Sequence, residues 1–331
     1  MPAFIIGSGT SIPDRVVSNE EIAPSLGLDP EQIFKSSGIL RRRWAEAGTT
    51  TSALASVALQ TAITDAGVLP EEIDYLIFGT MTPDRLIPGS APTVQRTLGL
   101  GQIPCLDIRQ ACCNPLYALQ IATALIGSNL ASRVAICLAE IQSAWLDMSP
   151  ESGTTSMLFG DGASALIVSG DTSSNSLEVI DIALATDGSY VDDLGVRGPG
   201  TEFGTAASGN ENSKPRMVGQ SVILNASRKI MAACQDVLKR NSLQVADIRW
   251  LVPHQANANL LAQIARGLHF PVENGGLISV LEDLGNTSSA SMGIALDSLR
   301  RSARISPGDY LLLPAFGAGF SWGAGLCRAT S

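Results

Sequence analysis

The sequence is short of the features that mark membrane, secreted and nucleic-acid-binding proteins. Its 331 residues contain no uninterrupted apolar run of about 18, the length that spans a membrane. The start, MPAFIIGSGT, has neither a basic leader nor a long apolar stretch, so we expect no secretory signal. Aromatic residues make up 5%, no basic stripe interleaves with them, and the net charge is −9. A nucleic-acid partner is therefore not expected.

Cysteine and histidine are scarce as well. The six cysteines are scattered without a CxxC pair, and the chain has two histidines. This pattern predicts neither a zinc site nor a disulfide framework, and a reducing cytoplasm is the default location for such a chain. We expect no bound metal.

What the chain does contain is an alternation of predicted strands and helices. It is 45% hydrophobic with 32 glycines, which is typical of a globular α/β protein. Strands are expected over 3–9, 75–80, 104–108 and 134–140. Helices are expected over 51–67, which Gly67 ends, near 89–98, and over 113–126, whose almost wholly apolar sequence predicts burial.

Two sequence patterns recur in the same order. LPEEIDYLIFGT (69–80) matches LQVADIRWLVPH (243–254), and LFGDGASALIV (158–168) matches AFGAGFSWGAGL (315–326). Chance recurrence is the alternative for either match alone, but the two together predict duplicated halves, residues 1–175 and 176–331. The segment 186–215, rich in Gly, Ser and Asn, is expected to be a surface loop joining them.

Two other stretches are interpreted as structural. GSGTSI (7–12) follows a predicted strand but lacks the third glycine of a dinucleotide-binding loop, and Pro13 stands where the helix of such a loop should begin. The basic run LRRRW (40–44) is expected to be a solvated face, with contact to a small anionic ligand as the alternative.

The segment DIRQACCNPLYAL (107–119) places Cys112 and Cys113 between a predicted strand and an apolar helix. A thiol in the first turn of a helix faces free N–H groups and the positive end of the dipole, which lower its pKa and favour a nucleophilic thiolate. The same N–H groups can hold an oxyanion. Because free cysteines are also common in protein cores, packing is the alternative role for both.

Two polar residues of the second half stand at the ends of buried elements. His254 ends the predicted strand in LVPHQANANL, and Asn286 lies in a turn before a helix rich in small residues, in LGNTSSASMGIALDSL. Both suit hydrogen-bond donation to a reacting oxygen. A satisfied core histidine is the alternative for His254, and His269 is expected on the surface.

These segments carry a resemblance. DIRQACCNPLYAL, LFGDGASALIV, LVPHQAN, GNTSSASMGIALD and FGAGFSWGAGL resemble the β-ketoacyl-ACP synthase III family of the thiolase superfamily, in its order and spacing and over essentially the whole chain. The resemblance implies a five-layered α/β/α/β/α sandwich of two similar halves. It also implies an acyltransferase that makes β-ketoacyl products from acyl and malonyl thioesters of CoA or a carrier protein, as a homodimer without a bound cofactor.

The family's site residues map onto this sequence one by one. The nucleophile, five residues after Asp107, falls on Cys112, and Cys113 takes the place of a small residue. The resemblance implies that His254 and Asn286 hydrogen-bond the malonyl thioester carbonyl and stabilise the enolate left by decarboxylation. It further implies binding roles for residues of FGAGF (316–320) and of the loop that contains Ile87. The backbone N–H groups of Cys112 and Ala318 would form the oxyanion hole beside Gly317, Phe316 would exclude water, and Ile87 would reach a neighbour's acyl pocket.

The chain departs from the family pattern at several positions. Asn and Pro follow the cysteine pair where the family has Gly and often an aromatic residue. Gln32 and Ser36 replace the Trp and Arg that flank a CoA adenine, and Leu224 and Asn259 replace basic residues that dock a carrier protein. A specialised member in secondary metabolism is therefore a plausible interpretation.

Other functions are weighed against this one. Acyl transfer to a hydroxyl, an amine or another carrier without decarboxylation is the nearest alternative. A papain-like peptidase also orders Cys, His and Asn, but this chain lacks the Trp-flanked cysteine motif and the spacing of that class. A non-catalytic partner subunit would be expected to lose the cysteine.

Overall fold

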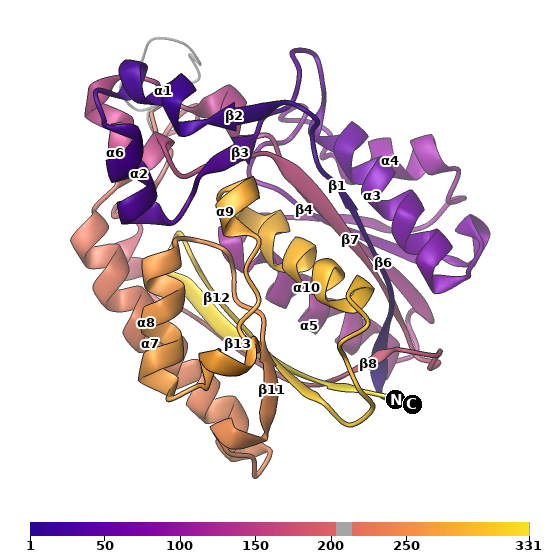
Figure 1. Cartoon of the computed structure of the whole chain (residues 1–331). Helices are drawn as coiled ribbons and strands as arrows, with labels where there is room; N and C mark the ends of the chain where they lie inside the picture. The colour runs from indigo at the N-terminus through magenta and orange to yellow at the C-terminus, as the bar shows by residue number, and fades with distance from the viewer. Residues whose placement is uncertain (203–213, 331) are drawn as a thin grey trace.

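The computed structural model describes residues 1–202 and 214–330 (Figure 1). Among these residues, nine strands form one mixed sheet in the order β11-β12-β13-β8-β1-β7-β6-β4-β5. Their bounds are β1 (Ala3–Ser11), β4 (Tyr75–Gly79), β5 (Cys105–Ile108), β6 (Arg133–Glu140), β7 (Gly162–Ser169), β8 (Leu177–Thr186), β11 (Ile248–Leu251), β12 (Tyr310–Gly317) and β13 (Ser321–Ala329). Two short antiparallel pairs lie outside this sheet, β2 (Val16–Ser18) with β3 (Arg41–Arg43) and β9 (Leu194–Gly195) with β10 (Arg216–Met217).

The strands alternate their side chains between a middle core and two outer cores. The middle core holds two buried helices, α5 (Asn114–Gly127) and α10 (Ser291–Arg301), which lie at the centre of Figure 1. One outer core packs α3 (Thr51–Ala66) and α4 (Ala91–Leu98) on β1, β4, β6 and β7. The other packs α7 (Gly219–Arg240) and α8 (Ala258–Leu268) on β11, β12 and β13. The expected five-layered α/β/α/β/α sandwich is therefore confirmed.

A fourth, smaller cluster covers one end of the sandwich. It is built around α1 (Asn19–Leu26), α2 (Pro30–Ser37), α6 (Gly153–Ser156) and α9 (Leu281–Leu284). Figure 1 shows α1, α2 and α6 together beside β2 and β3. None of the helices in the described ranges combines the length and hydropathy needed to cross a bilayer.

The first recurring pattern adopts the same local structure in both copies. Each copy forms a short 3-10 turn and then a strand, 70–72 followed by β4 and 245–247 followed by β11. The segment expected to join the halves, 186–215, follows β8, which pairs with β13 on one side and with β1 on the other. Residues 203–213 of this segment lie outside the described part.

The segments GSGTSI (7–12) and LRRRW (40–44), both interpreted as structural, lie in different environments. Gly7 and Gly9 let β1 lie against α3, because a Cβ on either would overlap the backbone of Ala62 or Ala58. The prediction of a solvated face for the basic run is wrong for Arg42, which is fully buried. Its Nη1 donates to Asn19 Oδ1 at 2.8 Å and its Nη2 to the Met157 carbonyl at 2.7 Å, and burial lowers its pKa to about 10.

Candidate active site

Cys112 lies where the middle helix of the first half begins. A 3-10 turn, Ala111–Cys113, precedes α5, and Ala111 opens it with a left-handed backbone (φ 47°). The thiol Sγ lies 3.6 Å from the hydroxyl of Ser288. That serine opens the matching turn, Ser288–Ala290, in front of α10, also with a left-handed backbone (φ 48°). The two buried helices therefore bring their first turns together at the cysteine.

The resting state of Cys112 differs from the sequence-based expectation. Burial raises the pKa of its thiol to about 12, and the charge of Glu140 adds to this rise. The hydroxyl of Ser288 and the residue's own backbone N–H act in the opposite direction but do not compensate. The lowered pKa expected for Cys112 is therefore wrong, because desolvation outweighs the stabilisation available at a helix start.

Cys113 occupies a different environment. It is fully buried, and its thiol donates to the backbone carbonyl of Ser321 in β13 at 3.2 Å. Burial raises its pKa well above the ordinary value. Of the two adjacent thiols, the structure turns Cys112 toward Ser288 and buries Cys113 against the sheet.

Asn286 precedes the turn at the start of α10. Its backbone N–H donates to the Leu158 carbonyl at 2.8 Å, and its carbonyl accepts from Gly160 N–H at 3.1 Å. The side-chain Oδ1 accepts from the backbone N–H of Ser288 at 2.9 Å. Because that contact engages the carbonyl end of the side chain, the Nδ2 amide is the end that can donate to a substrate oxygen.

His254 follows β11 and faces the same turn. Its Nδ1 lies 2.7 Å from the hydroxyl of Ser291, which also accepts from the backbone N–H of Gln255 at 3.1 Å. The hydroxyl proton of Ser291 can therefore point at Nδ1, which places the ring proton on Nε2. Burial lowers the pKa of His254 to about 4, although a hydrogen bond to the Ser288 backbone raises it in part. His254 is thus a neutral donor near pH 7.

Ser288 is the point where the three predicted residues converge. Its hydroxyl faces Cys112, its N–H holds Asn286, and its backbone bonds to His254. A left-handed backbone at a residue other than glycine costs about 1–3 kcal/mol and persists where the surroundings hold it. In the sequence Ser288 is one of several small residues before α10, and its hydrogen bonds could not be predicted from that pattern.

The residues of FGAGF span the end of β12 and the turn to β13. A Cβ on Gly317 would lie 2.9 Å from the backbone nitrogen of Cys112, so only glycine lets the end of β12 approach Cys112 so closely. Ala318 follows in the turn to β13. Phe316 is buried, with its ring centroid 4.8 Å from that of Phe320 in the core beneath α7 and α8.

Comparisons with known proteins identify the family of this chain. The family models for 3-oxoacyl-[acyl-carrier-protein (ACP)] synthase III and for its C-terminal part match residues 106–188 and 238–329. A β-ketoacyl-[acyl-carrier-protein] synthase III of Rhizorhabdus wittichii is 38% identical, and the alignment covers 98% of this chain and 99% of the relative. The chain belongs to the β-ketoacyl-[acyl-carrier-protein] synthase III family. It is therefore a condensing enzyme of the acyltransferase class.

Solved structures of the same family superpose over the full chain. The 3-oxoacyl-[acyl-carrier-protein] synthase III of Aquifex aeolicus is 30% identical with a TM-score of 0.89, covering 98% of this chain and 99% of the other. The priming β-ketosynthase of the R1128 polyketide pathway is also 30% identical, with a TM-score of 0.90 and coverage of 99% and 96%. The chain is thus similar to synthases named for an acyl carrier protein and to one from a polyketide pathway.

Three of the positions expected to depart from the family pattern, Gln32, Ser36 and Asn259, lie together. Ser36 lies in the last turn of α2, and its backbone carbonyl accepts from the Nδ2 amides of Asn257 and Asn259 at 3.0 and 2.8 Å. Ser36 itself donates to the carbonyl of Gln32 at 2.8 Å. Leu224 lies on α7 with 62% of its surface exposed. The α2–α8 contact is therefore polar and uncharged at these positions.

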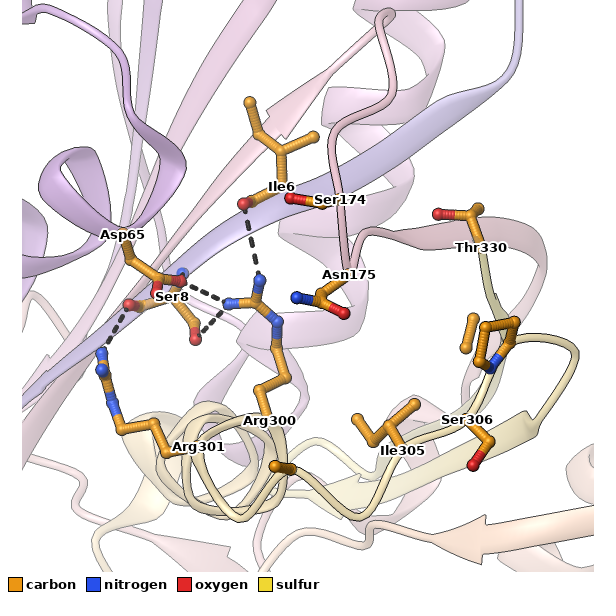
Figure 2. Close-up of a pocket in the computed structure, with 13 residues that line it drawn as sticks. Ile6, Ser8, Asp65, Ser174, Asn175, Arg300, Arg301, Ile305, Ser306 and Thr330 are labelled. Carbon is orange, nitrogen blue, oxygen red and sulfur yellow. Dashed lines mark hydrogen bonds and ion pairs between the residues drawn. The ribbon is translucent and has the colours of Figure 1, made fainter.

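A separate cavity of about 550 Å³ lies away from these residues (Figure 2). Arg300 and Arg301 line it, but both are already paired, Arg300 with Asp65 at 2.7 Å and Arg301 with Asp297 at 2.8 Å. It includes none of the predicted site residues. Among the described residues, no three His, Cys, Asp or Glu side chains form a group that could hold a metal.

The depressed pKa of His254 predicts a specific pH dependence of stability. The folded state favours the neutral ring. The contribution of His254 to the free energy of unfolding is therefore complete above pH 6.5 and is lost as the pH falls from 6.5 to about 4. Over that range the free energy of unfolding of the wild type should fall by about 3 kcal/mol more than that of His254→Gln. Urea unfolding of both proteins at pH 4 to 7 measures this difference, and parallel curves would contradict the burial of a neutral His254.

Proposed function

We propose that Cys112 is the acyl acceptor of this synthase. Its sulfur attacks the carbonyl carbon of an acyl thioester, the bond from that carbon to the carrier sulfur breaks, and the thiol proton leaves on the carrier thiol. The N–H groups of Cys112 and Ala318 hold the oxyanion. The convergence of Cys112, His254 and Asn286 on the turn at Ser288 supports the assignment most directly.

In the second half of the reaction a malonyl thioester enters. His254 Nε2 and Asn286 Nδ2 donate to its thioester carbonyl and stabilise the enolate that forms as carbon dioxide leaves. The enolate carbon then attacks the acyl carbonyl on Cys112, the bond from that carbon to the Cys112 sulfur breaks, and the departing sulfur takes up a proton from solvent. No strong base is required, because decarboxylation supplies the carbanion, and this fits a site whose histidine is neutral near pH 7.

We propose in addition that the chain acts as a homodimer. Ile87 lies in the loop between β4 and α4 with 87% of its surface exposed, and its neighbour Leu86 is 75% exposed. Two adjacent apolar side chains at such exposure are costly in water and suit burial in a partner's acyl pocket.

The first prediction separates the two cysteines. Cys112→Ala should abolish the mass increase seen after incubation with an acyl thioester, because it removes the nucleophile, whereas Cys113→Ala should keep it. Intact-protein mass spectrometry reads both. Labelling at full level in Cys112→Ala would contradict the assignment.

The second prediction concerns the enolate. His254→Ala and Asn286→Ala should still take up an acyl group at Cys112, but malonyl decarboxylation should slow by about 10²–10³, as is usual when one oxyanion donor is lost. Acyl loading and carbon dioxide release are measured separately. If the wild type loads acyl groups but never releases carbon dioxide, acyl transfer to a different nucleophile becomes the better function.

The third prediction concerns the carrier. Gln32, Ser36, Leu224 and Asn259 supply no ring for an adenine and no charge for an acidic carrier, so we propose a dedicated pathway carrier as the natural partner. For one acyl group, kcat/KM should be similar with CoA and with a short synthetic thiol. A preference for the CoA thioester of about a hundredfold or more, with the fatty-acid carrier as best acceptor, would indicate ordinary fatty-acid initiation.

Charge restoration tests the same proposal. Asn259→Arg and Leu224→Lys should each raise kcat/KM for a fatty-acid carrier protein by up to about fivefold, the value of an exposed ion pair. Val57→Lys, at an exposed position on the opposite outer layer, adds the same charge and should have no effect. An equal gain in all three variants would reflect net charge rather than docking.

A further inference from the structure

The reaction as proposed leaves one buried acid of the site without a role. Glu140 ends β6, where it is fully buried. Its carboxylate oxygens accept from the backbone N–H of Met81 at 3.1 and 3.2 Å, from Thr82 Oγ1 at 3.0 Å and from Gln142 Nε2 at 3.2 Å. Met81 and Thr82 join the carboxylate to the segment that follows β4.

On its other side the same carboxylate holds the turn before α10. The hydroxyl of Ser289 donates to Glu140 Oε1 at 2.6 Å, and the Ser289 backbone also bonds to it. Ser289 immediately follows Ser288, and it takes the same place in the turn before α10 that Cys112 takes in the turn before α5. Glu140 thus binds Ser289, the immediate neighbour of Ser288, and Ser288 contacts all three proposed catalytic side chains.

We propose that Glu140 is a positioning residue that, through Ser289, holds the Asn286–Ser291 turn in the left-handed conformation that aligns Asn286 and His254 with Cys112. This inference rests on the proposed function. The left-handed backbone of Ser288 needs support from its surroundings, and among the described residues the carboxylate of Glu140 is the charged group bonded to this turn. A misplacement of about 1 Å at reacting groups can cost about a hundredfold in rate.

The electrostatics of the site give the inference a second readout. The titratable group facing Glu140 is the thiol of Cys112. The other partners of Glu140 are hydroxyl and amide groups, which come from the segment after β4, from Gln142 and from the Ser288–Ala290 turn. The charge of Glu140 raises the pKa of that thiol. Burial raises the pKa of Glu140 itself to about 7, so the carboxylate becomes charged as the pH rises above neutrality.

The test compares three nearly isosteric variants in the full chain. Glu140→Gln replaces an oxygen acceptor by an amide donor, and Ser289→Ala removes the donor that links the carboxylate to the turn. Ser56→Ala is the matched control, because it removes a buried serine hydroxyl of α3 that bonds to the Ser52 carbonyl and neither to Glu140 nor to the turn. Thermal unfolding is recorded for each, together with acyl loading, kcat and KM for malonyl decarboxylation, and the pH dependence of Cys112 alkylation.

We expect Glu140→Gln and Ser289→Ala to lose roughly ten- to a hundredfold in decarboxylation kcat, with KM for the malonyl thioester nearly unchanged. The double variant should be no slower than the slower single variant, and Ser56→Ala should keep the wild-type kcat. Wild-type kcat in Ser289→Ala, or an equal loss in all three variants that follows their stability, would overturn the inference.

The measurement of Cys112 alkylation distinguishes failure of this inference from failure of the proposed function. Glu140→Gln should lower the pH of half-maximal Cys112 alkylation, and Ser56→Ala should not, whether or not the wild type condenses thioesters. If the wild type is inactive but the alkylation shift appears, the proposed function has failed and the coupling of Glu140 to Cys112 stands. If the wild type is active and neither kcat nor alkylation changes in Glu140→Gln, the inference has failed alone.

Discussion

The site depends on the contact between the first turns of two buried helices. α5 and α10 lie side by side in the middle layer, and each begins with a 3-10 turn whose first residue has a left-handed backbone, Ala111 in one and Ser288 in the other. Cys112 belongs to the first turn, whereas Asn286 and the partners of His254 belong to the second or flank it. A shift of either turn would therefore separate the proposed nucleophile from the proposed donors.

The layered fold explains both the position and the chemistry of this contact. Helices sandwiched between two faces of the sheet have little access to water, so charged forms are disfavoured. The pKa of Cys112 rises and that of His254 falls for the same reason. The result is a site of neutral groups, in which hydrogen bonds to a developing negative charge are stronger than in water. Such a site suits a reaction that generates its own carbanion.

Much of this arrangement could be predicted from the sequence. Apolar segments of the sequence predicted the helices α3, α4 and α5 to within about two residues, and Gly67 predicted the end of α3. Recurring segments predicted the duplication, and sequence motifs are the basis on which Cys112, His254 and Asn286 are proposed.

What could not be predicted depends on contacts between distant parts of the chain. Arg42 belongs to a basic run that looks solvated, but it is buried where distant residues meet, among them Asn19 of α1 and Met157. The raised pKa of Cys112 results from burial, whereas the position of the residue before α5 suggested the reverse. Glu140 and Ser289 lie 149 positions apart, and no local pattern joins them. An acid that ends an otherwise apolar strand was the one available signal for Glu140.

The most direct test of the account is a single turnover of the wild-type enzyme. The protein is first loaded with one acyl group, freed of excess thioester, and then mixed with a malonyl thioester. We predict that the acyl group is lost from the peptide containing Cys112 while one carbon dioxide and one β-ketoacyl thioester form for each acyl group lost. Release of the acyl group as a free acid, or its transfer to the acceptor without carbon dioxide, would contradict the account.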